Sequence, residues 1–186
     1  MYKKPLIYLV IGYNKYSRLI EAFNDTLDIK FAIILTKSTH NQFYIVGIRM
    51  SLERFAKAQA TTYADALAEV KNGKKRTHWM WFIFPQIQGL GNSEFARHYA
   101  IKDINEAEAY LNHPVLGKRL IEISGALLKL NSNDAYAIFG SPDDMKLHSS
   151  MTLFSLTQST HPVFKQVLQE FYNGVQDPKT LQIIAK

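Results

Sequence analysis

Residues 74–91 read KKRTHWMWFIFPQIQGLG and contain both tryptophans of the chain, Trp79 and Trp81. A run of three cations, residues 74–76, opens this stretch. Aromatic faces, cations and a histidine this close together form either a ligand site or the centre of a hydrophobic core. The stretch therefore marks the region in which both the core and a functional site are expected.

Composition limits the classes of protein to consider. The chain has 186 residues, which fits one domain, or one domain with an appendage. It has no cysteine, which excludes disulfides and thiolate metal sites and is compatible with the cytoplasm, the location we predict. The net charge of +6 favours anionic partners, although Lys and Arg are spread along the chain. The longest apolar run near the start, Leu6–Ile11, is too short to cross a bilayer, so no membrane partner is predicted.

The chain changes character near Met50. One helix is predicted before it, at Lys15–Phe23. Three short runs rich in Ile, Tyr, Phe and Val predict strands: Leu6–Ile11, Phe31–Leu35 and Phe43–Ile48. Two interpretations of residues 1–49 follow. They form a small βαββ-like appendage, or they come from an upstream start codon and the natural protein begins at Met50.

We slightly favour the upstream start. Residues 1–49 are rich in amino acids that AT-rich codons encode, and Met50 is followed by SLERF, a good helix start. Ser51 is expected to cap a helix that ends near Lys71. The domain of interest is then residues 50–186.

Cap signals repeat through this domain. Thr77 is expected to cap a short helix from His78 to Phe84, and Ser93 and Asp103 to begin the next two. Later helix starts are expected at Pro114, Asp134, Ser141–Pro142, His161–Pro162 and Asp177–Pro178. Gly125, inside a predicted helix, suggests close contact with another helix. We predict an all-α body, an irregular array of about seven or eight short helices without strands.

The first group of candidate site residues surrounds the tryptophans. His78 can act as a general base or bind an anionic ligand, or it is a structural histidine held by a carbonyl. Trp79 and Trp81 can stack on a ring, but at least one is expected in the core. Arg76 would neutralise ligand charge, and the Gln86 amide would orient the ligand.

The second group lies in residues 141–153, which read SPDDMKLHSSMTL. Lys146 can meet an anion, while Asp144 opposes one. Ser149 and Ser150 either line a polar pocket or bond back to preceding carbonyls of their own helix. A catalytic set of Ser149, His78 and Asp144 can be drawn, but no nucleophile elbow supports it. The histidine and carboxylate spacings fit no metal site, and we predict neither a metal nor a cofactor.

Four segments resemble one family. They are HWMWFIFPQIQGLG (residues 78–91), YAI (residues 99–101), EAYLNHPVLGKRL (residues 108–120) and IFGSPDDMKLHSSMTLF (residues 138–154). They are similar to the small bacterial proteins of domain-of-unknown-function family 1810, sometimes mislabelled as calpastatin. The resemblance covers the chain from about Met50 onward, implies an irregular all-α fold, and supports the late start. It implies no activity and no catalytic residues.

Two functional hypotheses remain. In the first, the segments 75–86 and 141–152 form a pocket for a small anionic or nucleotide-like ligand. Its candidate residues are Arg76, His78, Trp79, Trp81, Gln86, Asp144, Lys146, Ser149 and Ser150. His78 is the candidate general base, but we make no prediction of catalysis. In the second hypothesis, the chain is a non-enzymatic module that binds a protein or a nucleic acid.

Overall fold

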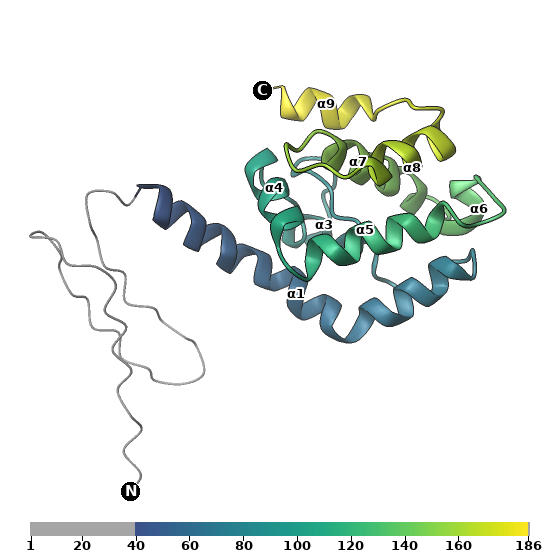
Figure 1. The fold of residues 1–186 in the computed structure, drawn as a ribbon, viewed down its shortest axis with the longest axis horizontal. Helices are drawn as coiled ribbons and strands as arrows, with labels where there is room; N and C mark the ends of the chain where they lie inside the picture. The colour runs from purple at the N-terminus through teal and green to yellow at the C-terminus, as the bar shows by residue number, and fades with distance from the viewer. Residues whose placement is uncertain (1–39, 186) are drawn as a thin grey trace, which may run out of the picture. The chain divides into compact units, whose positions relative to one another are not determined.

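The computed structural model describes residues 40–185, and the side chains from residue 51 onward (Figure 1). Contacts divide the chain into two units, Met1–Gly47 and Ile48–Lys186, and the core and the candidate site described below belong to the second. The described residues form nine helices: α1 (His40–Lys71), α2 (Met80–Ile83), α3 (Glu94–His98), α4 (Ile104–Asn112), α5 (Leu116–Leu127), α6 (Ala135–Phe139), α7 (Asp143–Ser155), α8 (Pro162–Tyr172) and α9 (Pro178–Ile184). Their β structure is limited to an isolated bridge between Ile87 and Ile101. The predicted all-α body is confirmed.

Helix α1 begins earlier than predicted. It includes Phe43–Ile48, so the strand predicted there is wrong, and so is the prediction that Ser51 is its N-cap. A short apolar run fits a strand or a buried helix equally well, and extending an existing helix avoids the cost of a new nucleus. The Ser51 hydroxyl instead donates to Glu106 Oε1 at 2.5 Å. The other elements predicted before Met50 lie outside the described residues.

From residue 52 onward, α1 buries one stripe of side chains. Leu52, Phe55, Tyr63, Ala66 and Val70 recur at helical spacing, and all are buried. The helix ends at Lys71, as predicted, and Gly73 reverses the chain with a φ of 66°. The stripe fixes which side of α1 faces the core.

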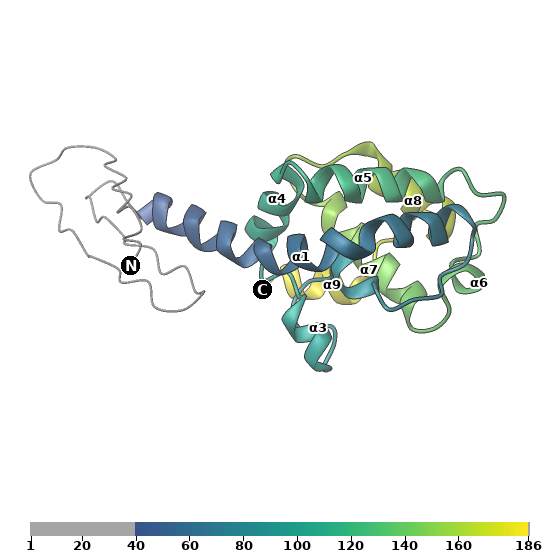
Figure 2. The ribbon, with the colours of Figure 1, turned by 90° about the horizontal axis from the view of Figure 1, so that it is seen from below.

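Helix α7 lies at the centre of the helical array. It contacts α2, α4, α6, α8 and α9, and Figures 1 and 2 show it surrounded by the other helices. Leu147 and every residue from Ser149 to Ser155 are buried. Since every residue from 149 to 155 is buried, the hydroxyl groups in this part of the helix must find partners within the protein.

Most predicted caps are confirmed. Ser93, Asp103, Asp134 and Asp177 each accept a backbone N–H at the start of a helix. Thr77 is an exception, because α2 begins at Met80 and Trp79 occupies the N-cap position. The starts expected at Ser141–Pro142 and Pro114 are also shifted, because Pro142 is itself the N-cap of α7 and α5 begins at Leu116. The Thr77 hydroxyl is used elsewhere in the fold.

Gly125 does not mark a close helix contact, so that prediction is wrong. A Cβ at Gly125 would meet nothing within 4 Å. The close approach in α5 is at Gly117, where a Cβ would lie 1.9 Å from the carbonyl oxygen of Leu111. The loop from α4 into α5 turns back on itself at this point, and only glycine leaves room for the carbonyl.

Candidate functional site

Two lysines share one aspartate at the start of α7. Lys75 Nζ lies 2.7 Å from Asp143 Oδ2, and Lys146 Nζ lies 2.8 Å from Asp143 Oδ1. The three side chains are 10%, 17% and 15% exposed for Lys75, Lys146 and Asp143. Burial alone would raise the pKa of Asp143, but hydrogen bonds and charge from both lysines lower it. With both lysines protonated, the group has a net charge of about +1 in a largely buried place.

Trp81 lies beside this group. Lys146 Nζ is 4.4 Å from the centroid of the Trp81 ring, within range of a cation–π interaction. The Trp81 indole N–H is buried, yet it has no hydrogen-bond partner among the described residues. We call Lys75, Trp81, Asp143 and Lys146 the lysine–tryptophan cluster. It joins α2 and the stretch before it to the first turn of α7, and therefore brings together Trp81 and Lys146, one candidate from each predicted segment.

Ser150 follows Lys146 by one helical turn. Its side chain is fully buried, and its hydroxyl has no hydrogen-bond partner in the described part of the chain. Buried polar groups in native proteins are nearly always paired, so an unpaired one needs a physical explanation. An ordered water or a bound ligand would provide the missing partner.

Trp79 belongs to the core, which confirms that at least one tryptophan is structural. Its side chain is fully buried between Phe84 and Phe139, with ring centroids 6.2 Å away in each case. Its indole nitrogen donates to Glu69 Oε2 at 2.8 Å. Lys75 Nζ lies 5.2 Å from the centroid of its ring. Trp79 thus contacts the cluster through Lys75 and, being fully buried, presents no free face to a ligand.

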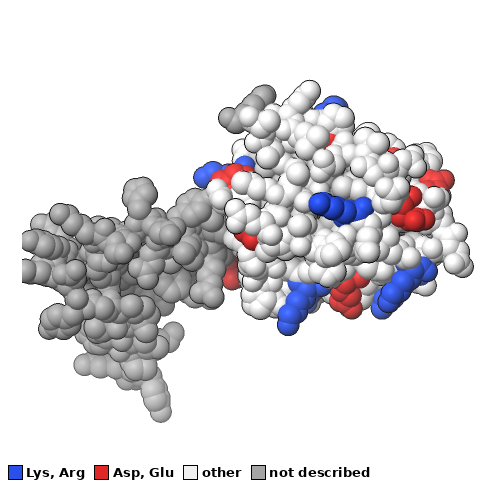
Figure 3. Space-filling model, turned by 45° about the horizontal axis from the view of Figure 1, so that its top comes forward, with Lys and Arg blue, Asp and Glu red and all other residues white. Residues whose placement is uncertain are grey.

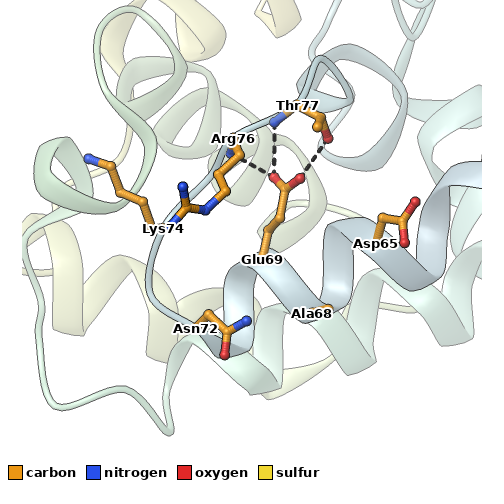
Figure 4. Close-up of a pocket in the computed structure, with 7 residues that line it drawn as sticks. All are labelled: Asp65, Ala68, Glu69, Asn72, Lys74, Arg76 and Thr77. Carbon is orange, nitrogen blue, oxygen red and sulfur yellow. Dashed lines mark hydrogen bonds between the residues drawn. The ribbon is translucent and has the colours of Figure 1, made fainter.

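Arg76 lies at a separate surface hollow of about 390 Å³ (Figure 4). Residues of α1 and of the stretch after it line the hollow: Asp65, Ala68, Glu69, Asn72, Lys74, Arg76 and Thr77. Figure 4 shows the Glu69 carboxylate directed at the backbone of Arg76 and Thr77. The carboxylates of Asp65 and Glu69 balance the two cations that line the hollow, whereas the lysine–tryptophan cluster has two lysines on one carboxylate. We therefore place the candidate site for an anion at the cluster and not in the hollow.

The remaining candidates before α3 are His78 and Gln86. His78 is exposed. Gln86 is half-buried, and its backbone carbonyl accepts the N–H of Ile101 at 2.8 Å. In the described part of the chain, no hydrogen bond joins His78 to Ser149 or Asp144. These positions offer no assembled nucleophile and base.

Asp144 and Ser149 face the last two helices. The Asp144 carbonyl accepts the Tyr172 hydroxyl at 2.7 Å, while its buried Oδ1 has no partner among the described residues. Ser149 Oγ lies 2.8 Å from Asp177 Oδ2 and 3.1 Å from the Met145 carbonyl. The predicted bond back to the preceding turn is therefore present at Ser149. The bond from Ser149 to Asp177, the N-cap of α9, joins α7 to α9.

Sequence reasoning missed three residues that organise the site. In the sequence, Lys75 is one of three consecutive cations, and Asp143 is one of two consecutive acids in the segment SPDDMKLHSSMTL. The i, i+3 spacing of Asp143 and Lys146 is a local signal that can suggest their pairing. Glu69 has no comparable signal, because its partners lie beyond the end of its helix.

The comparison with protein families identifies the family of this chain. The family model described as "Protein of unknown function (DUF1810)" matches residues 49–184. The chain belongs to this family. The resemblance inferred from its motifs is therefore confirmed.

A solved relative supports the fold. The crystal structure of the conserved hypothetical protein Rv1873 from Mycobacterium tuberculosis is 44% identical, with a TM-score of 0.71. The match covers 73% of this chain and 96% of the relative. No protein with a curated description matches this chain. The family and the solved relative thus establish the fold, and neither assigns an activity or a ligand.

The described surface gives few other signals. Figure 3 shows one face on which charged side chains are scattered among uncharged ones, without a cationic stripe. The described residues contain no group of three or more His, Asp or Glu placed to hold a metal ion. Within the same part of the chain, no helix has the length and apolarity needed to span a membrane.

Proposed function

We propose that the chain binds a small anionic ligand at the lysine–tryptophan cluster. The observation that carries the proposal is that Lys75 and Lys146, both largely buried, share the single carboxylate of Asp143. Removing a charge from water is costly unless an opposite charge compensates it. A bound anion would supply the second negative charge that this group lacks.

Two unpaired donors strengthen the proposal. The Trp81 indole N–H belongs to the ring that Lys146 contacts, and the Ser150 hydroxyl lies one helical turn after Lys146 along α7. Both groups are buried, and neither has a hydrogen-bond partner in the described residues. Phosphate and carboxylate oxygens accept such donors, and hydrogen bonds to a charged acceptor are stronger than neutral ones. An anion that entered the cluster would gain both charge compensation and hydrogen bonds.

We propose binding and not catalysis. The catalytic set of Ser149, His78 and Asp144 is not joined by hydrogen bonds among the described residues, because the Ser149 hydroxyl donates to Asp177 and to the Met145 carbonyl. Lys75 and Lys146 both contact Asp143, which suits charge recognition more than proton transfer. The alternative, a module for protein or nucleic-acid partners, is an outcome that the following experiment separates.

The test is calorimetric titration of the full chain with inorganic phosphate, followed by a series of phosphate esters. Lys146→Met is expected to abolish binding. Asp143→Asn is expected to strengthen it, because both lysines then lack a protein counter-ion. Opposite effects from two neighbouring side chains are difficult to obtain by general loss of structure.

Arg76→Met is the matched control, since it removes a cation from the hollow of Figure 4 and leaves the cluster intact. Its phosphate affinity should equal that of the parent. Absence of binding to any anion by the folded parent would refute the proposal. Salt-dependent binding of a nucleic acid that Lys146→Met leaves unchanged would favour the interaction module instead.

A further inference from the structure

We infer that the ligand contains a planar aromatic ring as well as an anionic group, and that Phe95 is the platform on which this ring stacks. The inference rests on the proposed function and names the class of ligand for the same site. A nucleoside monophosphate has the required chemistry. Phe95 would then be the residue that distinguishes a nucleotide from a simple phosphate ester.

Phe95 is carried by a loop whose two ends are joined. Gln88 N donates to the Ile101 carbonyl and Ile101 N donates to the Gln86 carbonyl, each at 2.8 Å. Between these bonds the chain forms an Ω-like loop that contains α3. Helix α3 buries none of its side chains, and Figure 2 shows it projecting from the body. Such loops commonly present binding residues while a rigid base holds their position.

The Phe95 ring is held by other rings and yet is open to solvent. Its centroid lies 5.4 Å from that of Trp81 and 6.3 Å from that of Tyr99. Tyr99 in turn lies against Phe55 and Phe82, at 5.9 and 5.2 Å, so it is anchored to the core. Phe95 nevertheless remains 57% exposed. A large ring that is positioned but uncovered is suited to stacking on another ring.

One small ligand can reach both Phe95 and the cations. Lys146 Nζ is 4.4 Å from the Trp81 centroid, and that centroid is 5.4 Å from Phe95, so the ammonium lies within about 10 Å of the Phe95 ring. A base stacked on Phe95 could therefore place its phosphate near Lys146. Aromatic stacking combined with a nearby cation is the usual way in which proteins bind nucleotide units without reading their sequence.

The neighbours of Phe95 argue against an apolar protein partner. Glu94, Arg97 and His98 on the same helix are exposed and polar. A protein partner docking on α3 would bury one aromatic ring among charged groups, whereas stable interfaces need a larger apolar centre. A single planar ring matches the size of this exposed surface better.

The experiment compares adenosine 5′-monophosphate, ribose 5-phosphate and adenosine by calorimetric titration of the full chain. The nucleotide is expected to bind about tenfold more tightly than ribose 5-phosphate, which is the effect of one stacked base. Phe95→Leu should reduce nucleotide affinity to that of ribose 5-phosphate. Phe95→Trp should keep the tenfold preference, because it keeps a stacking face.

Two negative outcomes are distinguishable. If both phosphates bind the parent equally, or if Phe95→Leu keeps the preference for the nucleotide, Phe95 is not a platform and only the proposed anion site survives. If neither phosphate binds, the proposed function fails and this inference fails with it. Circular dichroism of Phe95→Leu, whose parent side chain is mostly exposed, verifies that the variant is folded.

Discussion

The indole Nε1 of Trp79 donates to Glu69 Oε2 at 2.8 Å, which ties the last turns of α1 to the start of α2. The same carboxylate accepts the backbone N–H groups of Arg76 and Thr77 at 2.7 and 3.1 Å, and the Thr77 hydroxyl at 2.7 Å. One side chain therefore fixes the whole approach to α2. Because Trp81 lies on α2, Glu69 also sets the position of the lysine–tryptophan cluster.

Replacing Glu69 with glutamine should destabilise the fold at neutral pH by about 1–2 kcal/mol, since a neutral amide is a weaker acceptor for these donors. Burial alone would raise the pKa of Glu69, but its hydrogen bonds lower it from an ordinary value of 4.5 to about 2. The stabilisation is therefore complete above pH 4.5 and is lost as the pH falls towards 2. Urea unfolding of parent and variant at pH 7 and pH 3 measures both effects.

The control for this prediction is Glu53→Gln, which changes an exposed carboxylate on the same helix. It should shift the unfolding free energy by less than about 0.5 kcal/mol at both pH values. A Glu69→Gln variant whose deficit stays constant between pH 7 and pH 3 would contradict the proposed role of the ionised carboxylate.

Two glycines of α5 should respond oppositely to alanine. Gly125→Ala should stabilise the protein by up to about 1 kcal/mol, because the added methyl group meets open space and alanine favours a helix. Gly117→Ala should be strongly destabilising, because its Cβ would overlap the Leu111 carbonyl. Thermal unfolding of both variants measures the difference. Equal midpoints would show that the backbone at Gly117 can move away.

Asp143→Asn should destabilise the protein by about 2 kcal/mol, since it leaves two largely buried lysines without a counter-ion. The lysines lower the pKa of Asp143, so its contribution is present above its ordinary value of 3.8 and declines as the pH falls below it. Lys146→Met should cost less, because Lys75 remains paired with Asp143. Chemical unfolding at pH 7 compares the two variants, and a larger loss for Lys146→Met would oppose this account.

Adjacent serines of α7 provide a matched pair. Ser149→Ala should cost about 1 kcal/mol, because the Asp177 carboxylate loses a donor at 2.8 Å. Ser150→Ala should be neutral or stabilising in the unliganded protein, because its buried hydroxyl has no partner in the described residues. Unfolding curves measured without added anions test this contrast. A costly Ser150→Ala would point to a bound water as the hidden partner.

Much of the helical fold could be predicted because helix ends are local. Asp103 accepts the N–H of Glu106 at 2.9 Å, and Asp134 accepts that of Ala137 at 2.9 Å, as their spacing predicts. These bonds span three residues, so a short window of sequence contains all the information. The start of α1 could not be predicted in this way, because Phe43–Ile48 satisfies the patterns of a strand and a helix alike.

The sequence by itself determined the family, the all-α class and the presence of a structural tryptophan. Only the tertiary structure decided that Trp79 is the buried one, that Lys75 and Lys146 meet at Asp143, and that Glu69 holds the approach to α2. The physical reason is distance along the chain. A cap is formed by neighbours in sequence, whereas the charge cluster exists only after α2 has docked on α7, and the packing of the whole core sets that arrangement.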